Sequence, residues 1–537
     1  MRSSFAATAM AFALIIARPT HALTAQDFGS FAQGGPSERA VLLGQWAARG
    51  DTGLATFIAS LENGEYRSTP EGKLVRTLDG ETFTDAATDS VLGAPKPEWE
   101  DVVVSNVLRA GVEGAKAALQ LSIPDEGERL QAAKDLLEAE LDPAILPAIE
   151  KAAVKETSPA IKALLDGLVA KLALSADEPE KRIAAARALG ESGDASNNLK
   201  LLDARINPGE DSSIAETDSV VRLEIAKIAA GLRTKVWFYE MTGHLFTGIS
   251  LGSILVLVAL GLAITYGLLG VINMAHGELV MIGAYTTYLV QGVFRSHFAA
   301  SESVYILAAI PAAFLVSGLV GVALERLILR HLYGRPLESL LATWGVSLFL
   351  IQTVRSLFGP QNVEVASPAW LSGSLVLQSN LVLPWNRLAI IAFAGTVLVL
   401  TAIVLTKTRL GLFIRATTQN RAMSRCVGVK TSLVDMMAFG LGSGLAGLAG
   451  VALSQVGNVG PDLGQGYIVD SFLVVVVGGV GQLAGSLWAG LGIGMLTKFL
   501  EPTVGAVLAK IALLVLIILF IQKRPQGLFA LKGRQAD

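Results

Sequence analysis

Three polar side chains, Asn273, His276 and Glu278, stand close together in an otherwise apolar stretch that two glycines, Gly270 and Gly277, interrupt. Polar groups are costly at membrane depth unless they pair or line water, so this cluster indicates a polar path through an apolar medium. The alternative is that the three groups cap a helix end at the membrane surface. A metal site is disfavoured, because no second His or Cys accompanies the pair of possible ligands.

A second glycine-rich interruption, Gly478-Gly-Val-Gly-Gln-Leu-Ala-Gly485, lies nearer the C-terminus. Backbone that leaves a helix inside a bilayer must find partners in protein or cavity water, and paired breaks in two halves of a transporter point to its path. The glycines could instead only permit close helix packing. We expect the path to be lined by Asn273, His276, Glu278, Thr286, Gln291 and Gln482, with the breaks at Gly270, Gly277, Gly478 and Gly485.

The basic segment from Thr408 to Lys430 is long enough for a short helix at the membrane surface. We expect Arg415, Arg421 and Arg425 to take part in gripping an ATPase subunit, with the helix ended by Gly428. The alternative is that these cations only contact lipid head groups. In the expected orientation Arg415 and Arg421 point outward, and three apolar side chains point inward: Leu412, Phe413 and Val427.

Several kinds of chemistry are excluded or disfavoured by the sequence. The match to G-x-G-x-x-G at Gly442 to Gly447 lies inside an apolar span without a preceding strand, so we expect neither dinucleotide binding nor any other cofactor. No G-x-x-x-x-G-K-[ST] motif occurs, so energy for active transport must come from a partner or an ion gradient. Cys426 is the only cysteine, and the net charge of −3 gives no basic field for nucleic acid. We therefore predict no catalytic residues and no metal.

The composition indicates an integral membrane protein, because 52% of the 537 residues are hydrophobic and only 17% are charged. Lys and Arg cluster at 326–335, 407–430 and 523–534, which the positive-inside rule places in the cytoplasm. An exported N-terminal part and an inward C-terminus require an odd number of crossings. We predict nine, at 245–269, 271–294, 304–329, 338–358, 387–406, 433–455, 467–482, 484–500 and 505–522, whereas merging the seventh and eighth would give eight.

The first 238 residues differ sharply in composition from the rest. Residues 1–22 have the charged start, apolar run and small-residue ending of a signal peptide, with an uncleaved anchor as the alternative. Residues 23–238 are rich in Ala and charge, and Arg129 to Leu136 is nearly repeated at Arg182 to Leu189. This recurrence predicts a HEAT-like helical domain that serves interactions rather than catalysis. Asp79-Gly80 predicts a hairpin within it.

Residues 239–537 form the predicted transmembrane domain, and three of its segments resemble a known family. The run Leu251 to Tyr285, the loop Thr408 to Lys430 and the break Gly478 to Gly485 resemble permeases of the branched-chain amino acid/urea class of ABC importers. Together these segments span almost all of 245–535. The resemblance implies an all-helical, multi-pass protein of the bacterial inner membrane with a periplasmic N-terminal domain. It also implies a periplasmic substrate-binding protein, a second homologous permease and two ATPase subunits as partners.

Within this class, the exported helical domain and the C-terminal sequence resemble the urea-transporting permease, in particular at Lys498 to Pro502 and Gln522 to Arg534. Urea needs amide, hydroxyl and carbonyl partners along its path. A branched-chain amino acid, the alternative substrate, needs an apolar slot and partners for two charged ends. Two further alternatives stay open: a channel or gradient-driven carrier, and a sensor or adhesion module tethered by a membrane anchor.

Overall fold

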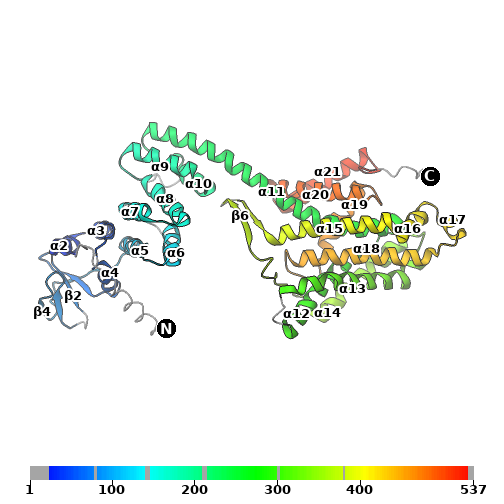
Figure 1. Cartoon of the computed structure of the whole chain (residues 1–537), viewed down its shortest axis with the longest axis horizontal. Coiled ribbons are helices and arrows are strands. Elements are labelled where there is room, and N and C mark those ends of the chain that lie inside the picture. The colour runs from blue at the N-terminus through cyan, green and yellow to red at the C-terminus, as the bar shows by residue number, and fades with distance from the viewer. Residues whose placement is uncertain are drawn as a thin grey trace. The chain divides into compact units, whose positions relative to one another are not determined.

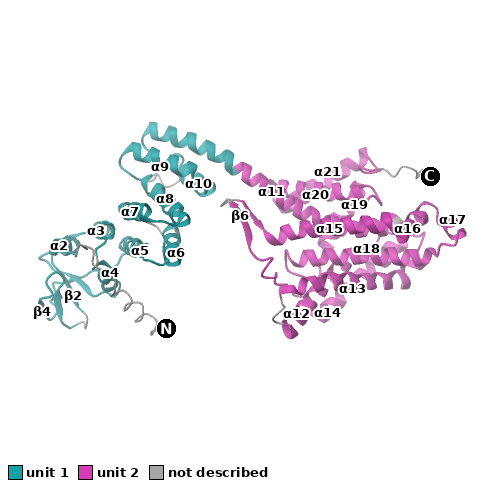
Figure 2. Ribbon diagram, viewed as in Figure 1, with its two compact units in different colours: residues 1–236 teal, residues 237–537 magenta. Residues whose placement is uncertain are grey.

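The computed structural model describes residues 23–51, 53–77, 81–121, 123–138, 145–208, 215–298, 303–378 and 381–529. It divides into two compact units, Met1–Val236 and Trp237–Asp537, close to the boundary that the change in composition predicts (Figure 2). The predicted signal peptide, residues 1–22, lies outside the described residues.

The first part of unit 1 packs three helices beside a small sheet: α2 (Ala25–Gln33), α3 (Pro36–Arg49) and α4 (Leu54–Glu62). The sheet has the order β4-β3-β2-β1-β5, with β1 (Tyr66–Ser68), β2 (Leu74–Thr77), β3 (Phe83–Asp85), β4 (Val91–Gly93) and β5 (Glu100–Asp101). Phe31, Trp46 and Phe57, one from each of the three helices, form a buried aromatic core in this part of unit 1. Strands β2 and β3 pair antiparallel, as the predicted hairpin requires, although Asp79-Gly80 itself lies outside the described residues.

The second part of unit 1 contains only helices among its described residues: α5 (Asn106–Gln120), α6 (Glu126–Glu138), α7 (Leu146–Lys155), α8 (Pro159–Ala173), α9 (Pro179–Glu191) and α10 (Ala195–Ile206). The two near-copies in the sequence make the same contacts. Arg129 of α6 binds Glu156 and the carbonyls of Ile123 and Pro124, and its hydrogen bond holds the pKa of Glu156 below its usual range.

Arg182 of α9 repeats this arrangement with Glu216 and the carbonyls of Ala176 and Asp177. The accepting carbonyls stand six and five residues before the arginine in both copies. The repetition therefore extends from sequence to hydrogen bonding. Assignment of the domain to the HEAT type stays a prediction.

Unit 2 is a helical bundle (Figure 1). Its helices are the C-terminal part of α11 (Ser219–Leu269), α12 (His276–His297), α13 (Tyr305–Leu327), the short η4 (Leu329–His331), α14 (Pro336–Phe358), α15 (Trp385–Lys407), α16 (Arg409–Gln419), α17 (Arg421–Cys426), α18 (Thr431–Ser454), α19 (Gln465–Gly478), α20 (Leu483–Val504) and α21 (Ala506–Lys523). One hairpin, β6 (Ser374–Gln378) with β7 (Leu381–Pro384), precedes α15.

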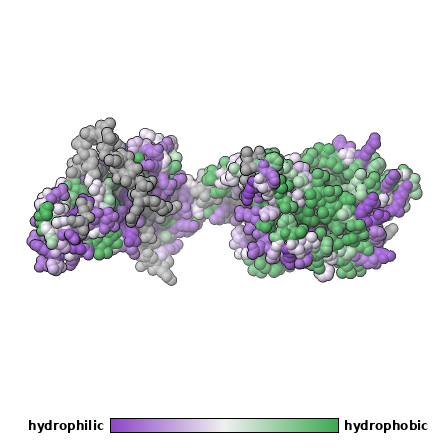
Figure 3. Space-filling view, turned by 90° about the horizontal axis from the view of Figure 1, so that it is seen from below, coloured by the Kyte–Doolittle hydropathy of each residue, from purple (hydrophilic) through white to green (hydrophobic). Residues whose placement is uncertain are grey.

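Each of the nine predicted spans coincides with a helix, but only seven described helices are long and apolar enough to cross a membrane: α11, α13, α14, α15, α18, α20 and α21. Helix α12 is not among them; it contains polar residues at both ends, including Glu278 and Arg295. Helix α19 has 14 residues and so measures about 21 Å, short of the ~30 Å hydrocarbon layer. Apolar side chains cover much of the visible surface of unit 2 (Figure 3).

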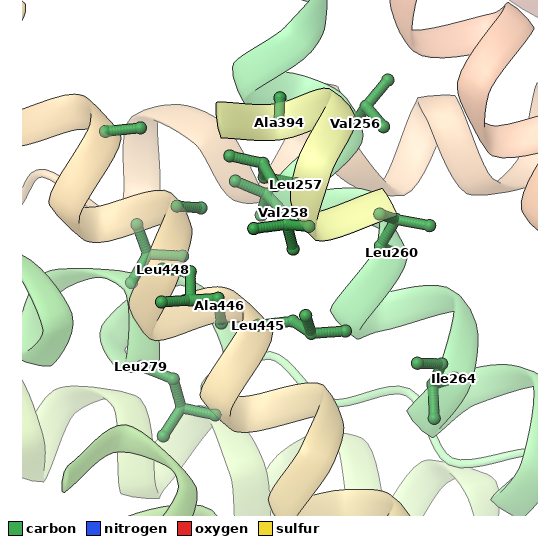
Figure 4. Close-up of a cluster of buried hydrophobic side chains, with 14 of the residues drawn as sticks. Val256, Leu257, Val258, Leu260, Ile264, Leu279, Ala394, Leu445, Ala446 and Leu448 are labelled. Atoms are coloured by element: carbon green, nitrogen blue, oxygen red, sulfur yellow. The ribbon is translucent and has the colours of Figure 1, made fainter. Parts of the chain in front are cut away.

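Leucine, isoleucine, valine and alanine side chains of α11, α12, α15 and α18 form the largest apolar cluster of unit 2 (Figure 4). Glycines let these helices approach each other closely. A Cβ added to Gly283 of α12 would collide with the backbone of Gly447 of α18, and one on Gly450 would collide with the backbone of Val280 and Ala284. The glycine motif at Gly442 to Gly447 thus lies in contacts between helices.

We expect Gly283→Ala to lower the free energy of unfolding by about 1–3 kcal/mol, because the added methyl group must push α12 and α18 apart. The measurement is thermal unfolding of the detergent-purified protein. Gly292→Ala is the matched control on the same helix, since nothing lies within 4 Å of its added methyl group. Equal effects of the two substitutions would contradict the close contact.

Candidate functional site

The first break occurs where α11 ends and α12 has not yet begun. Gly270 has a φ of 64°, in the left-handed region, and residues 271–275 form no regular structure before His276. One backbone group of this segment finds its partner on α14, where Thr343 Oγ1 accepts from the Met274 amide at 3.1 Å. The single proton of this hydroxyl has the Ser339 carbonyl of its own helix within 2.9 Å and the Ile272 carbonyl of the break within 3.3 Å. The Thr343 hydroxyl therefore gives the Met274 amide a hydrogen-bond acceptor, which lipid cannot provide.

The position of this contact along α14 places the break relative to that helix. Thr343 lies roughly 10 Å, and Ser347 roughly 16 Å, from the first residue of a helix about 35 Å long, at 1.5 Å per residue. Ser347 donates to Glu278 Oε1 at 2.7 Å, so the beginning of α12 is level with the middle of α14. Transporter folds commonly place their substrate site at this level, near the bilayer midplane.

The three polar residues of the break are buried, with Asn273 2%, His276 0% and Glu278 1% exposed. They do not cap a helix at a surface, which disfavours that alternative. His276 Nε2 lies 3.0 Å from the Val258 carbonyl of α11. One polar atom on each, Asn273 Nδ2, His276 Nδ1 and Glu278 Oε2, has no hydrogen-bond partner among the described residues. The described residues also contain no group of three or more potential metal ligands.

The second break separates α19 from α20. Gly479 and Gly481 both have positive φ, and a Cβ on Gly478 would collide with the backbone of Gly485. A Cβ on Gly267, near the end of α11, would lie 2.8 Å from the Gly481 Cα. The residues leading into the first break therefore contact the second break directly.

The first break also contacts the beginning of α19. A Cβ placed on Gly277 would lie 2.6 Å from the Gly464 carbonyl oxygen, which is closer than real Cβ atoms approach. Gly464 is the residue that precedes α19. The N-termini of α12 and α19 thus meet backbone to backbone, and both glycines are required there for lack of space.

A cavity of about 130 Å³ lies beside this junction. It is lined by Leu262 and Tyr266 of α11, by Ile272, Asn273 and Met274 of the break, and by Ile468, Val469 and Phe472 of α19. Asn273 supplies the amide among side chains that are otherwise mostly apolar. The cavity is therefore an apolar slot, and the Asn273 side-chain nitrogen beside it is almost wholly buried.

The structure does not bring the other predicted path residues into this cavity. Thr286 donates to the Ile282 carbonyl of its own helix, and Gln291 donates to the Ala366 carbonyl. Gln482 precedes α20 at the second break and is half-buried. His276 and Glu278 lie on the adjoining turn, facing α11 and α14 respectively. Of the six predicted residues, Asn273 lines the cavity.

The sequence analysis did not identify the buried hydroxyl residues of α14 or the residues of α19 that line the cavity. Ser339, Thr343 and Ser347 recur every four residues in an apolar helix, and each is nearly fully buried. That spacing could have identified them, because it aligns three hydroxyl groups on one helix face. The slot-forming residues of α19 carried no comparable signal.

The basic segment folds into two short helices, α16 and α17, in which Arg415 is exposed, as expected. Helix α16 buries the face that contains Gly411, Ile414 and Thr417. A Cβ on Gly411 would collide with the Leu405 backbone, so only glycine fits at that position. The apolar side chains expected to point inward are exposed: Leu412 by 56%, Phe413 by 39% and Val427 by 71%. Met423 is exposed by 60%.

The arginines of the segment bind other residues of unit 2. Arg421 forms an ion pair with Asp435, which is fully buried in the first turns of α18, and its guanidinium lies 5.0 Å from the centre of the Tyr333 ring. Arg425 donates to Thr431 Oγ1, and Arg415 donates to the Leu405 carbonyl. Gly428 has a φ of 87° where the segment turns into α18, as its predicted role at the helix end requires.

Comparison with known proteins adds the family. A family model described as "Branched-chain amino acid transport system / permease component" matches residues 244–522. The high-affinity branched-chain amino acid transport system permease protein BraD of Pseudomonas aeruginosa is 28% identical over 296 residues, which cover 54% of this chain and 96% of BraD. LivH of Escherichia coli K12, described in the same words, is 27% identical over 297 residues, covering 54% of this chain and 96% of LivH.

A probable branched-chain amino acid transport permease protein, LivH of Methanocaldococcus jannaschii, is 26% identical over 292 residues, covering 51% of this chain and 88% of its own. No solved structure matches this chain. These relatives are permease subunits and not enzymes, as expected, and with the apolar helices they indicate a multi-pass membrane protein. The family match covers more than half of the chain and contains both breaks, the slot and the basic segment, so this protein belongs to the family of permease components of branched-chain amino acid transport systems.

Proposed function

We propose that this chain is the membrane-spanning subunit of an ATP-binding-cassette importer and that it carries branched-chain amino acids. The observation that carries the proposal is the apolar slot at the first break, level with the middle of α14. The relatives, described as branched-chain amino acid permeases, support the same substrate class. They favour branched-chain amino acids over urea, the substrate that the N-terminal domain and the C-terminal sequence suggested.

The size and lining of the slot fit a branched aliphatic side chain. Its volume of about 130 Å³ is close to that of a cavity of about 150 Å³, lined by Leu, Ile and Phe, that binds benzene. A leucine side chain has four carbon atoms and therefore fits. Urea would leave most of its hydrogen-bonding groups facing Leu262, Ile468 and Phe472 without partners, and unpaired polar groups disfavour binding.

The breaks supply the parts that alternating access needs. Helices α11 and α12 meet at an irregular segment, and α19 and α20 meet at another, so each half-helix can tilt without breaking helical hydrogen bonds. We propose that the path opens alternately to the two sides of the membrane around the slot. The sequence has no P-loop motif, so two ATPase subunits supply the energy, a second homologous permease completes the path, and a binding protein delivers the substrate.

We propose that the ATPase subunit contacts the exposed apolar side chains of the basic segment, and that the arginines transmit the movement. Leu412, Phe413, Met423 and Val427 are exposed on a segment whose neighbours are polar, which is typical of a protein contact. Arg421 ties the segment to α18 through Asp435, so a movement of α17 is passed to a helix that packs against α12 and α13.

We propose that unit 1 is exported and serves as a docking domain for the binding protein in the periplasm of a bacterium. The support is the signal-peptide pattern of residues 1–22 and the repeated arginine contacts, which are typical of stacked helix pairs that present an interaction surface. Deleting residues 24–235 should raise the concentration of binding protein needed for half-maximal uptake. The rate of uptake at saturating binding protein should stay unchanged.

Cells that contain the complete system should take up labelled leucine at micromolar concentration, and cells lacking this gene should lose that uptake. Labelled urea is the parallel substrate. Uptake of urea but not leucine, dependent on the gene, would contradict the proposed substrate. Leucine uptake that survives replacement of the Walker lysine in the partner ATPase would instead show a channel or gradient-driven carrier.

Val427→Asp should reduce leucine uptake at least tenfold while leaving membrane insertion intact, because it places a charge in the proposed apolar contact. The measurements are uptake and the ATPase activity of the reconstituted complex. Gln419→Asp adds the same charge at an exposed polar position of the same segment and should keep most of the uptake. Retained uptake in Val427→Asp would contradict the apolar contact.

Arg421→Glu should abolish uptake, because it leaves the fully buried Asp435 carboxylate without its cation and adds a like charge. The double variant Arg421→Asp with Asp435→Arg restores opposite charges and should recover part of the uptake. A single variant with normal uptake, or a double variant that assembles normally but transports no better than the single one, would argue against transmission through this pair.

A further inference from the structure

We propose that Tyr333 couples the basic segment to the first break, so that its ring passes a movement of α17 to the segment before α12. This inference rests on the proposed function, because it concerns how a movement that begins at the ATPase subunit reaches the substrate path. Tyr333 lies between η4 and α14 and is half-buried. The ion pair of Arg421 with Asp435 reaches α18, whereas Tyr333 provides contacts that lead to the break itself.

The ring of Tyr333 contacts the basic segment through Arg421. The guanidinium carbon lies 5.0 Å from the centre of the ring, within the distance at which a cation is attracted to an aromatic face. Arg421 is the first residue of α17, and its ion pair with Asp435 holds the guanidinium in place. A displacement of α17 therefore moves the guanidinium against the ring of Tyr333.

The same tyrosine packs against a small apolar cluster that contains a residue of the first break. Val271, Leu329 and Phe439 form this cluster, and all three are nearly fully buried. Val271 belongs to the irregular segment between α11 and α12. Close-packed side chains transmit a displacement because few voids exist to absorb it. A movement of the Tyr333 ring therefore reaches the backbone of the break through Val271.

The hydroxyl group of Tyr333 fixes the position of the ring. It donates to Glu325 Oε1 at 2.9 Å, and Glu325 is a nearly fully buried residue close to the end of α13. The other oxygen of this carboxylate has no hydrogen-bond partner among the described residues. A buried carboxylate depends on the donors that it has, so this hydrogen bond keeps the ring between α17 and the cluster.

Helix α14 joins Tyr333 to the break by a second route. The helix begins three residues after Tyr333, and its Thr343 accepts from the Met274 amide of the break. One turn further along α14, Ser347 donates to Glu278 in the first turn of α12. Tyr333 is thus connected to the two sides of the break, by packing to its first residues and by α14 to its last.

The test measures leucine uptake and ATP hydrolysis in the same proteoliposomes, which contain the complete complex with its partner subunits and the binding protein. The quantity compared is labelled leucine taken up per ATP hydrolysed. Tyr333→Leu should lower this ratio at least fivefold and change ATP hydrolysis less than twofold, because the proposed ATPase contact is intact and the transmission to the break is lost. Some uptake should remain through the ion pair of Arg421 with Asp435.

Tyr333→Phe is the matched variant. It removes the hydroxyl group, as Tyr333→Leu also does, but it keeps the ring that contacts Arg421. It should retain at least half of the wild-type uptake per ATP. Tyr239→Leu makes the same change as Tyr333→Leu at a half-buried tyrosine of α11 near the beginning of unit 2, and it should leave the ratio unchanged.

A double-mutant cycle tests whether Tyr333 acts through Arg421. Arg421→Lys keeps a positive charge beside Asp435 but loses the planar group that stacks on the ring, so it should lower uptake per ATP at least threefold. In the Arg421→Lys background, Tyr333→Leu should lower the ratio by less than a further twofold, because the contact that it removes is already lost.

A wild-type ratio in Tyr333→Leu would overturn the inference. Equal losses in Tyr333→Phe and Tyr333→Leu would overturn it as well, and so would a parallel fall of uptake and ATP hydrolysis, which indicates a purely structural role. If Tyr333→Leu does not assemble, a wild-type ratio in Arg421→Lys decides against the inference.

Failure of the proposed function gives a different result, which appears in the wild-type complex. Uptake without ATP would show that no ATPase drives this chain, and the coupling role of Tyr333 would fail with it. Uptake of urea instead of leucine would remove only the proposed substrate, and the same variants would then be compared by urea taken up per ATP.

Discussion

The hydroxyl group of Thr343 satisfies the constraint on which the rest of unit 2 depends. A membrane helix that stops at mid-depth leaves amide and carbonyl groups without partners, and lipid offers none. Here one side chain of α14 accepts from the Met274 amide in the segment before α12 and lies 3.3 Å from the Ile272 carbonyl of the same segment. Once that segment is held, α12 can begin inside the membrane, its polar first turn can be buried, and a slot can form between the break and α19.

The second constraint is space. The two half-helices α12 and α19 meet through Gly277 and Gly464, and α12 meets α18 through Gly283 and Gly447. In lipid, helix association depends on packing and hydrogen bonds instead of a hydrophobic driving force, so small residues at contacts contribute directly to stability. Such backbone contacts account for a part of the glycines in this apolar sequence, whereas an added Cβ would meet nothing within 4 Å at others, such as Gly292 and Gly395.

The sequence predicted the helices of unit 2 and both breaks, since hydropathy and glycine spacing report on them directly. It offered Asn273, which lines the cavity, together with Thr286 and Gln291, which bond within α12 or to a loop carbonyl. Polarity in an apolar helix indicates burial or pairing, and only the three-dimensional arrangement shows which of the two applies. The face of α16 that packs on the bundle was not predicted, because it is determined by the close approach of Gly411 to the Leu405 backbone.

The paired arginine contacts of unit 1 have a consequence for how such a domain can change over evolutionary time. Arg129 and Arg182 each fasten their own helix pair through bonds to segments close by in the chain, with Glu156 and Glu216 as the acceptors. Adding or deleting one complete pair leaves the fastening of the others unchanged. Unit 1 can therefore gain or lose whole helix pairs. The helices of unit 2 cannot be added or removed in this way, because close glycine contacts join them to several neighbours.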